Sequence, residues 1–122
     1  MVSFKGVAQD KVLLNTFDPA FVHNVYFWLH NPDSEEDRAA FETALKELLR
    51  NSMYTRTNFI GTPPKAIRDV VDDTFTYNLV VTFHSAEAQE NYQVEEAHLK
   101  FIEDAKHLWK KVVVYDAIGY VE

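Results

Sequence analysis

The chain has 122 residues, of which 47% are hydrophobic and 14% aromatic, and its formal net charge is −7. This length suits one domain, and this hydrophobic content excludes a disordered chain. The acidic balance, without a lysine or arginine cluster, argues against nucleic acid as a partner. The absence of cysteine excludes disulfides and thiolate chemistry.

Nothing in the sequence predicts a membrane segment or an export signal. No apolar run reaches the roughly 18–20 residues that span a bilayer. The first six residues lack the compact apolar core and the small-residue cleavage site of a signal peptide. We therefore expect a cytoplasmic protein that binds neither membrane nor nucleic acid.

The first half of the chain predicts a strand and a helix after a short extension. Residues 1–18 are interpreted as an N-terminal extension, with Val12–Leu14 as a candidate short edge strand, and residues 19–122 as the domain. Residues 21–30 are rich in β-branched and aromatic side chains, which is typical of a strand. A helix then begins at Asp33 or Ser34, which can cap it, and ends near Asn51. Its apolar stripe consists of Phe41, Ala44, Leu45, Leu48 and Leu49.

The second half predicts the remaining strands and helices. Residues 53–60 read as a weaker edge strand, residues 75–84 as a strong strand, and residues 112–118 as the last strand. Between the last two, Ser85 caps a short helix through Tyr92, and a second helix runs from His98 to Trp109. The order strand, helix, strand, strand, helix, strand is that of an α+β ferredoxin-like βαββαβ fold with an antiparallel sheet.

One face of this sheet lacks a helix to cover it. Tyr26, Trp28, Val80 and Tyr115 are expected on that face, where they would form a larger apolar patch than a monomer normally exposes. Packing the sheets of two copies together removes the patch and protects the strand edges. We therefore predict a homodimer through this sheet face, which forms a dimeric α+β barrel.

His98 and Tyr92 are the leading candidates for a functional site. His98 stands at the start of the apolar stripe of the second helix, and Tyr92 lies a short segment before it. The pair can be a general base near neutral pKa with a phenol at hydrogen-bonding distance. The alternative is a partly buried histidine whose hydrogen bond to the phenol fixes the helix start. Spacing alone favours this structural interpretation.

Residues on two strands extend the candidate site. His23 has the same strand parity as Val25, and Tyr77 has that of Leu79. If these faces meet the helices, His23, Val25, Tyr77 and Trp109 converge with Tyr92 and His98 on one ligand-binding cavity. The alternative is an aromatic core with one histidine in it.

The sequence gives no support for a metal or a cofactor. His30 and His84 end strands, and no metal-binding spacing of histidines occurs. An acidic loop at Asp69, Asp72 and Asp73 is interpreted as solvated. With three glycines in the chain there is no phosphate-binding loop.

Several of these segments, in this order, resemble the stress-responsive dimeric α+β barrel (Dabb) family. The resemblance covers residues 20–118 and rests on Phe21-Val22-His23-Asn24-Val25, Val81-Thr82-Phe83-His84-Ser85-Ala86-Glu87-Ala88, Tyr92 with Ala97-His98, and Trp109-Lys110-Lys111-Val112 before Tyr115-Asp116. In a plant polyketide cyclase of this family, the histidine that matches His98 acts as general base, and the tyrosine that matches Tyr92 orients it or binds the carbonyl oxygen. The residues matching His23 and Trp109 line the pocket.

The chain departs from that cyclase pattern at two places. Glu95-Glu96 replaces a histidine and a proline, and Tyr77 replaces a further pocket histidine. Three hypotheses follow: a protein that binds an aromatic or apolar small molecule, a cyclase, lyase or isomerase that uses His98 and Tyr92, and a structural stress protein without a ligand.

Overall fold

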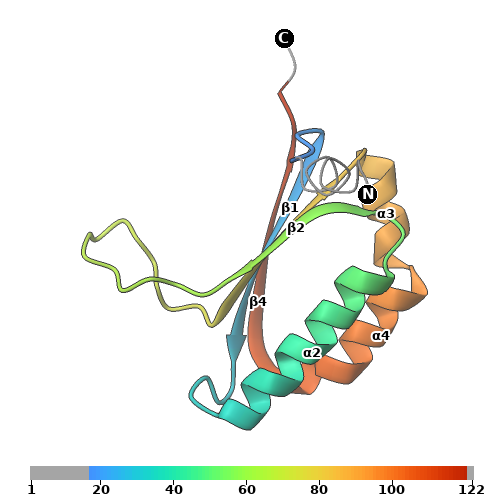
Figure 1. Cartoon of the computed structure of the whole chain (residues 1–122). Coiled ribbons are helices and arrows are strands. Elements are labelled where there is room, and N and C mark those ends of the chain that lie inside the picture. The colour runs from blue at the N-terminus through green and yellow to red at the C-terminus, as the bar shows by residue number, and fades with distance from the viewer. Residues whose placement is uncertain (1–16, 121–122) are drawn as a thin grey trace, which may run out of the picture.

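The computed structural model describes residues 17–120, which form one sheet and the helices that pack on it (Figure 1). In chain order the elements are β1 (Phe21–Leu29), α2 (Glu35–Asn51), β2 (Thr55–Gly61), β3 (Tyr77–Phe83), α3 (Ala86–Gln93), α4 (Glu96–Ala105), the short 3₁₀ helix η1 (Lys106–Leu108) and β4 (Trp109–Ile118). The candidate edge strand near residues 12–14 lies outside the described residues.

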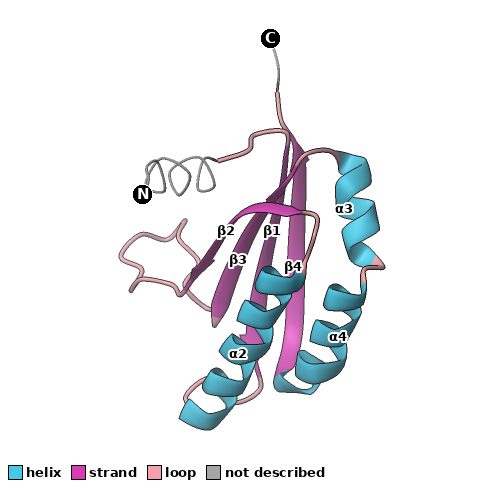
Figure 2. Ribbon diagram, turned by 45° about the vertical axis from the view of Figure 1, so that its right-hand side comes forward, coloured by secondary structure: helices cyan, strands magenta, loops and turns pink. Residues whose placement is uncertain are grey.

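The sheet is antiparallel throughout and has the strand order β2-β3-β1-β4. The three α-helices of the described residues lie on one face of it, with α2 and α4 side by side (Figure 2). The predicted α+β ferredoxin-like arrangement is therefore confirmed. None of the helices in the described part of the chain is long and apolar enough to cross a membrane.

Strand β1 lies in the centre of the sheet, and its side chains alternate between the two faces. The odd positions from Phe21 to Leu29 are all buried beneath the helices, and the even positions are half-buried on the other face. Phe27 is at the middle of the core, with its ring centroid 4.9 Å from that of Phe41 and 5.3 Å from that of Trp109. Phe27 also packs edge-on against Phe101 of α4 at 6.1 Å, so that it contacts both helices.

The structure corrects the predicted boundary between the last helix and the last strand. Helix α4 ends at Ala105, η1 follows, and Trp109 is the first residue of β4 rather than the end of a helix. Trp109 pairs with Leu29 across the sheet, and the His30 amide donates a hydrogen bond to the Leu108 carbonyl at 3.0 Å. These contacts with β1 end the helix although the apolar spacing continues to Trp109.

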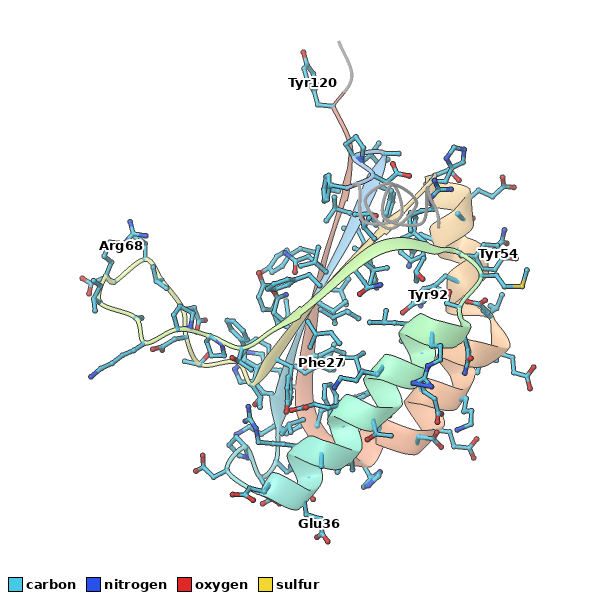
Figure 3. All side chains as sticks on the ribbon, in the orientation of Figure 1. Phe27, Glu36, Tyr54, Arg68, Tyr92 and Tyr120 are labelled. Carbon is cyan, nitrogen blue, oxygen red and sulfur yellow. The ribbon has the colours of Figure 1, made fainter. Side chains whose placement is uncertain are left out.

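The sheet face without helices carries a hollow of about 510 Å³. The long connection of residues 62–76 borders it and projects away from the helices, with Arg68 near its tip (Figures 1 and 3). The Trp28 indole donates a hydrogen bond to the Thr74 hydroxyl at 3.0 Å, which ties this connection to β1. The hollow is lined by Tyr26, Trp28, Pro64, Val71, Asp72, Phe75, Asn78, Lys111, Val113 and Tyr115.

Candidate functional site

A pocket of about 190 Å³ lies on the helix-covered face, between the sheet and α4. Phe27 and Tyr92, both labelled in Figure 3, point into the space between sheet and helices. The pocket walls are mostly apolar, and polar atoms come from His23, Tyr92, Gln93 and His98. The remaining lining residues are Val25, Phe27, Leu79, Phe101, Ile102, Trp109, Val112 and Val114.

Tyr92 enters the pocket from the last turn of α3. Ser85 caps this helix by accepting a hydrogen bond from the Ala88 amide at 3.1 Å, which places Tyr92 two turns later against the sheet. Its side chain is 1% exposed, and its ring lies 4.9 Å from that of Phe83. Burial, and secondarily the nearby Glu95 carboxylate, raise the pKa of Tyr92 well above its usual range, so the phenol stays protonated.

His98 lies on the first turn of α4, with its ring centroid 4.7 Å from that of Tyr92. The expected hydrogen bond between these two side chains is not formed. Instead, Nδ1 of His98 donates to the Gln93 carbonyl oxygen at 3.1 Å, because a carbonyl can only accept. The proton of the neutral ring is therefore on Nδ1 and the lone pair on Nε2.

The surroundings of His98 keep its ring neutral near pH 7. Burial is the largest effect and lowers the pKa of His98 below its ordinary value of 6.5. The bond to Gln93 and the charge of Glu95 act in the opposite direction, and His23 adds to the lowering. A neutral imidazole with a free Nε2 is the form that accepts a proton.

His23 forms a pair with a residue that the sequence analysis did not assign to the site. Nδ1 of His23 lies 2.5 Å from Oδ1 of Asp116 on β4, and the two residues are partners in the strand register. The His23 ring is buried and packs edge-on against Tyr92 at 5.9 Å. Asp116 faces the same side of β4 as the pocket residue Val114. Placing β4 beside β1 in this register would have predicted its contact with His23.

Val25 and Trp109 form part of the apolar wall. Trp109 packs between Phe27 and Phe101, at ring-centroid distances of 5.3 and 5.7 Å. Val25 is next to His23 on the same face of β1 and is 5% exposed. The structure thus brings together five of the six residues predicted for the site: His23, Val25, Tyr92, His98 and Trp109.

Tyr77 does not line this pocket. It lies on the same face of the sheet but packs against α2, where its ring stacks on Phe41 at 4.8 Å. Its hydroxyl donates a hydrogen bond to the Glu42 carboxylate, and the Arg38 guanidinium lies 4.9 Å from its ring centroid. Burial, followed by the bond to Glu42, raises the pKa of Tyr77 far above its ordinary range. Its role here is to anchor α2.

The described residues contain no group of three or more histidine, aspartate and glutamate side chains placed to hold a metal ion. The acidic loop instead organises its own backbone. Asp73 accepts a hydrogen bond from the Ala66 amide at 2.9 Å, and Asp72 accepts one from the Thr74 amide at 2.8 Å.

Solved structures with the same fold cover most of this chain. A hydroxynitrile lyase from Passiflora edulis has a TM-score of 0.70 and 22% identity, with 83% of this chain and 94% of that chain covered. A Dabb family protein with a ferredoxin-like fold from Mesorhizobium loti has a TM-score of 0.68 and 17% identity, with 83% and 97% covered. A dimeric protein of unknown function with a ferredoxin-like fold from Bacteroides fragilis has a TM-score of 0.64 and 16% identity, with 84% and 99% covered.

The sheet, the helices on one face and the pocket between them define a ferredoxin-like α+β domain. The model of the stress responsive A/B barrel domain, Dabb, matches residues 21–118, and the chain belongs to this family. No curated protein matches the sequence.

Proposed function

We propose that this protein binds a small aromatic molecule with one polar substituent in the pocket between the sheet and α4. The observation that supports this is the composition of the pocket: apolar walls with two imidazoles and a phenol among them. Ligand sites commonly combine a mostly apolar surface with a few polar groups that fix orientation.

The size of the pocket narrows the class of ligand. A cavity of roughly 150 Å³ holds one benzene ring, and this pocket measures about 190 Å³. One aromatic ring with a hydroxyl or a carbonyl group therefore suits it. The ring would contact Phe101, Ile102 and Trp109, and the polar group would bind to the histidines or to Tyr92.

Binding can be tested with phenol and benzaldehyde as probes, by following the chemical shifts of the protein. In Ile102→Phe the added ring fills the pocket, and we expect the affinity for both probes to fall at least about tenfold, or ~1.4 kcal/mol. Leu99→Phe is the matched control, because Leu99 lies on the same helix and is 54% exposed. If millimolar probe leaves the shifts of the pocket residues of the wild type unchanged, pocket binding is rejected and the structural stress protein is favoured.

The same proposal includes a homodimer through the helix-free face of the sheet. The rings of Tyr26, Phe75 and Tyr115 gather there, with centroid distances of 5.0 and 6.3 Å from Tyr26 to the other two. Tyr115 is 65% exposed in the single chain. The similar protein from Bacteroides fragilis is described as dimeric. Light scattering should give twice the chain mass at micromolar concentration, and a monomer would overturn this part of the proposal.

A second candidate function is acid–base catalysis by His98, as in a lyase or isomerase. It is favoured by the neutral His98 ring with a free Nε2 beside Tyr92, and by the similarity of the fold to a hydroxynitrile lyase. In the cleavage of a cyanohydrin, Nε2 would take the hydroxyl proton as the carbonyl forms. The carbon–carbon bond breaks, and the leaving cyanide takes the proton from Nε2 of His98, which restores the neutral ring and releases hydrogen cyanide.

This candidate is tested by the release of benzaldehyde from mandelonitrile. His98→Ala should abolish turnover while the melting temperature remains close to that of the wild type. His107→Ala is the control, since His107 is exposed on η1 and does not line the pocket. A wild type without turnover, or a His98→Ala variant that keeps it, rejects catalysis of this reaction by His98.

A further inference from the structure

Tyr92 and His98 are carried by two different helices, and the bend between those helices sets their relative position. Helix α3 ends at Gln93 and α4 begins at Glu96, so that only Val94 and Glu95 separate them. The bend is closed by a hydrogen bond from the Glu95 amide to the Tyr92 carbonyl at 3.1 Å. Any change in the path of these two residues moves one ring relative to the other.

Glu95 occupies the N-cap position of α4 but does not cap it. A side chain at this position usually accepts a hydrogen bond from an amide of the first helical turn, and Glu95 makes no such bond. Its carboxylate reaches instead to the end of α2. Oε1 accepts a hydrogen bond from the Ser52 hydroxyl and Oε2 one from the Met53 amide, both at 2.7 Å.

Ser52, which donates a hydrogen bond to Glu95, is itself held in place by backbone hydrogen bonds. Ser52 is the C-cap of α2, and its amide donates to the Leu48 carbonyl at 2.9 Å. Its hydroxyl also accepts a hydrogen bond from the Tyr54 amide at 3.2 Å, at the start of the path into β2. Through Ser52, Glu95 connects the α3–α4 bend to the α2–β2 connection, which are 43 residues apart in the sequence.

We propose that Glu95 is the positioning residue of the pocket: its carboxylate braces the α3–α4 bend against Ser52 and Met53, and this brace holds Tyr92 and His98 in their relative position. The role in ligand binding rests on the proposed function; the bracing and the effect on His98 do not. The titratable groups around His98 are His23 on β1, which is paired with Asp116 on β4, Tyr92 on α3 and Glu95 itself. Of these, Glu95 is the carboxylate that acts directly on His98, and it opposes the effect of burial.

The charge and the brace can be separated with two variants of Glu95. The side chain of Glu95→Gln retains an acceptor for Met53 and a hydrogen-bonding group for Ser52, but it lacks the negative charge. Glu95→Ala removes both the brace and the charge. Glu96→Gln is the matched control, because Glu96 is the neighbouring acid on the first turn of α4 and is exposed.

The first measurement is an NMR titration of the His98 ring in each variant, without ligand. We expect the pKa of His98 to shift downward in Glu95→Gln and to remain at the wild-type value in Glu96→Gln. A purely structural role of Glu95 would not produce this difference. Equal pKa values in the two variants would contradict the effect of the Glu95 charge on His98.

The second measurement is the set of ring-to-ring NOEs between Tyr92 and His98. They should be present in the wild type and in Glu95→Gln, and weakened or lost in Glu95→Ala. Ser52→Ala removes one of the two bonds to Glu95 and should give an intermediate result. NOEs of full intensity in Glu95→Ala would overturn the bracing role.

The third measurement is the affinity for phenol, which should fall in Glu95→Ala and be restored in Glu95→Gln. A wild type that does not bind phenol contradicts the proposed ligand, and the two ligand-free measurements still decide the role of Glu95. A wild type that binds phenol with the same affinity as Glu95→Ala contradicts the role of Glu95 in binding alone.

Discussion

Two buried tyrosines, Tyr77 and Tyr92, provide a matched comparison at the scale of single residues. Each is 1% exposed, but only Tyr77 has a hydrogen bond from its hydroxyl, to Glu42. Within residues 17–120 the Tyr92 hydroxyl makes no hydrogen bond, and it lies at the pocket. The hydroxyl therefore stabilises the fold at Tyr77, whereas at Tyr92 it is a group that the ligand of the proposed function would contact.

We expect Tyr77→Phe to lower the free energy of unfolding by about 1–2 kcal/mol, because a buried hydrogen bond to a carboxylate is lost. Tyr92→Phe should change it by less than about 0.5 kcal/mol while weakening the binding of phenol. Urea unfolding and phenol titration of both variants check this. Equal losses of stability would contradict the assignment of the two hydroxyls.

The ionisation of His98 should appear in the pH dependence of stability. Burial lowers the pKa of His98 in the folded protein, so the unfolded chain binds this proton more tightly. The neutral His98 ring therefore contributes to the free energy of unfolding. This contribution is fully present above the ordinary histidine pKa of 6.5, and it is lost as the pH falls toward the lower pKa of the folded protein. Between about pH 5 and pH 7 the free energy of unfolding should rise less steeply in His98→Gln than in the wild type. Parallel curves from urea unfolding would contradict this.

Most of the candidate residues could be assigned from the sequence to the correct face of the sheet. Their positions along the strands could not be predicted. Strand parity put His23 and Tyr77 beneath the helices, where both are found. Distance along the sheet depends on strand register, and the register brings His23 opposite Asp116 and Tyr77 opposite Phe27. Tyr77 therefore lies against α2, although its parity is that of the pocket residues.

At the scale of elements, the short helix α3 depends on its cap. A helix of eight residues is not stable by itself in water, and Ser85 accepts one of the unpaired amides at its start. We expect Ser85→Ala to lower the free energy of unfolding by about 1 kcal/mol, and to reduce the affinity for phenol because α3 carries Tyr92.

Ser34→Ala in α2 is the matched control for this prediction. Ser34 caps its helix in the same way, by accepting a hydrogen bond from the Asp37 amide at 3.1 Å, but it lies away from the pocket. The cost in stability should be similar, while phenol binding should not change. An equal loss of phenol affinity in both variants would indicate that the effect is global.

The starts of α2 and α3 were readable from the sequence because caps are local signals: Ser34, one of the two candidates for α2, and Ser85 of α3 both accept the capping hydrogen bond. The start of α4 at Glu96, which has no side-chain cap, was predicted two residues too late, at His98. Contacts between distant segments left no such signal. The end of α4 at Ala105 is set by pairing with β1, and the bonds of Glu95 reach Ser52 and Met53. An acidic residue before a helix looks like an ordinary helix start, so its partner at the far end of α2 could not be predicted.

At the scale of the whole molecule, the order of elements sufficed to predict the ferredoxin-like fold, since few topologies join these elements without crossings. The proposed homodimer is based on the sheet face that the helices of the described residues leave uncovered. We expect Tyr115→Glu to convert the dimer to a monomer, because it places a charge within the apolar face that we propose as the interface. Tyr120→Glu is the control, since Tyr120 is 89% exposed and follows the end of β4. Light scattering of both variants gives the mass, and a dimeric Tyr115→Glu would contradict this interface.

The central position of β1 also has a consequence for the synthesis of the protein. This strand precedes both of its partners, β3 and β4, in the sequence, and Phe21 pairs with Ile118 in the last strand of the sheet. Folds that depend on pairing between strands distant in the sequence form slowly, and an apolar strand is prone to aggregation until its partner strands have been synthesised. A nascent chain that stops before β4 therefore exposes one edge of this central strand, and a chaperone that shields Phe21–Leu29 during translation should raise the yield of folded protein.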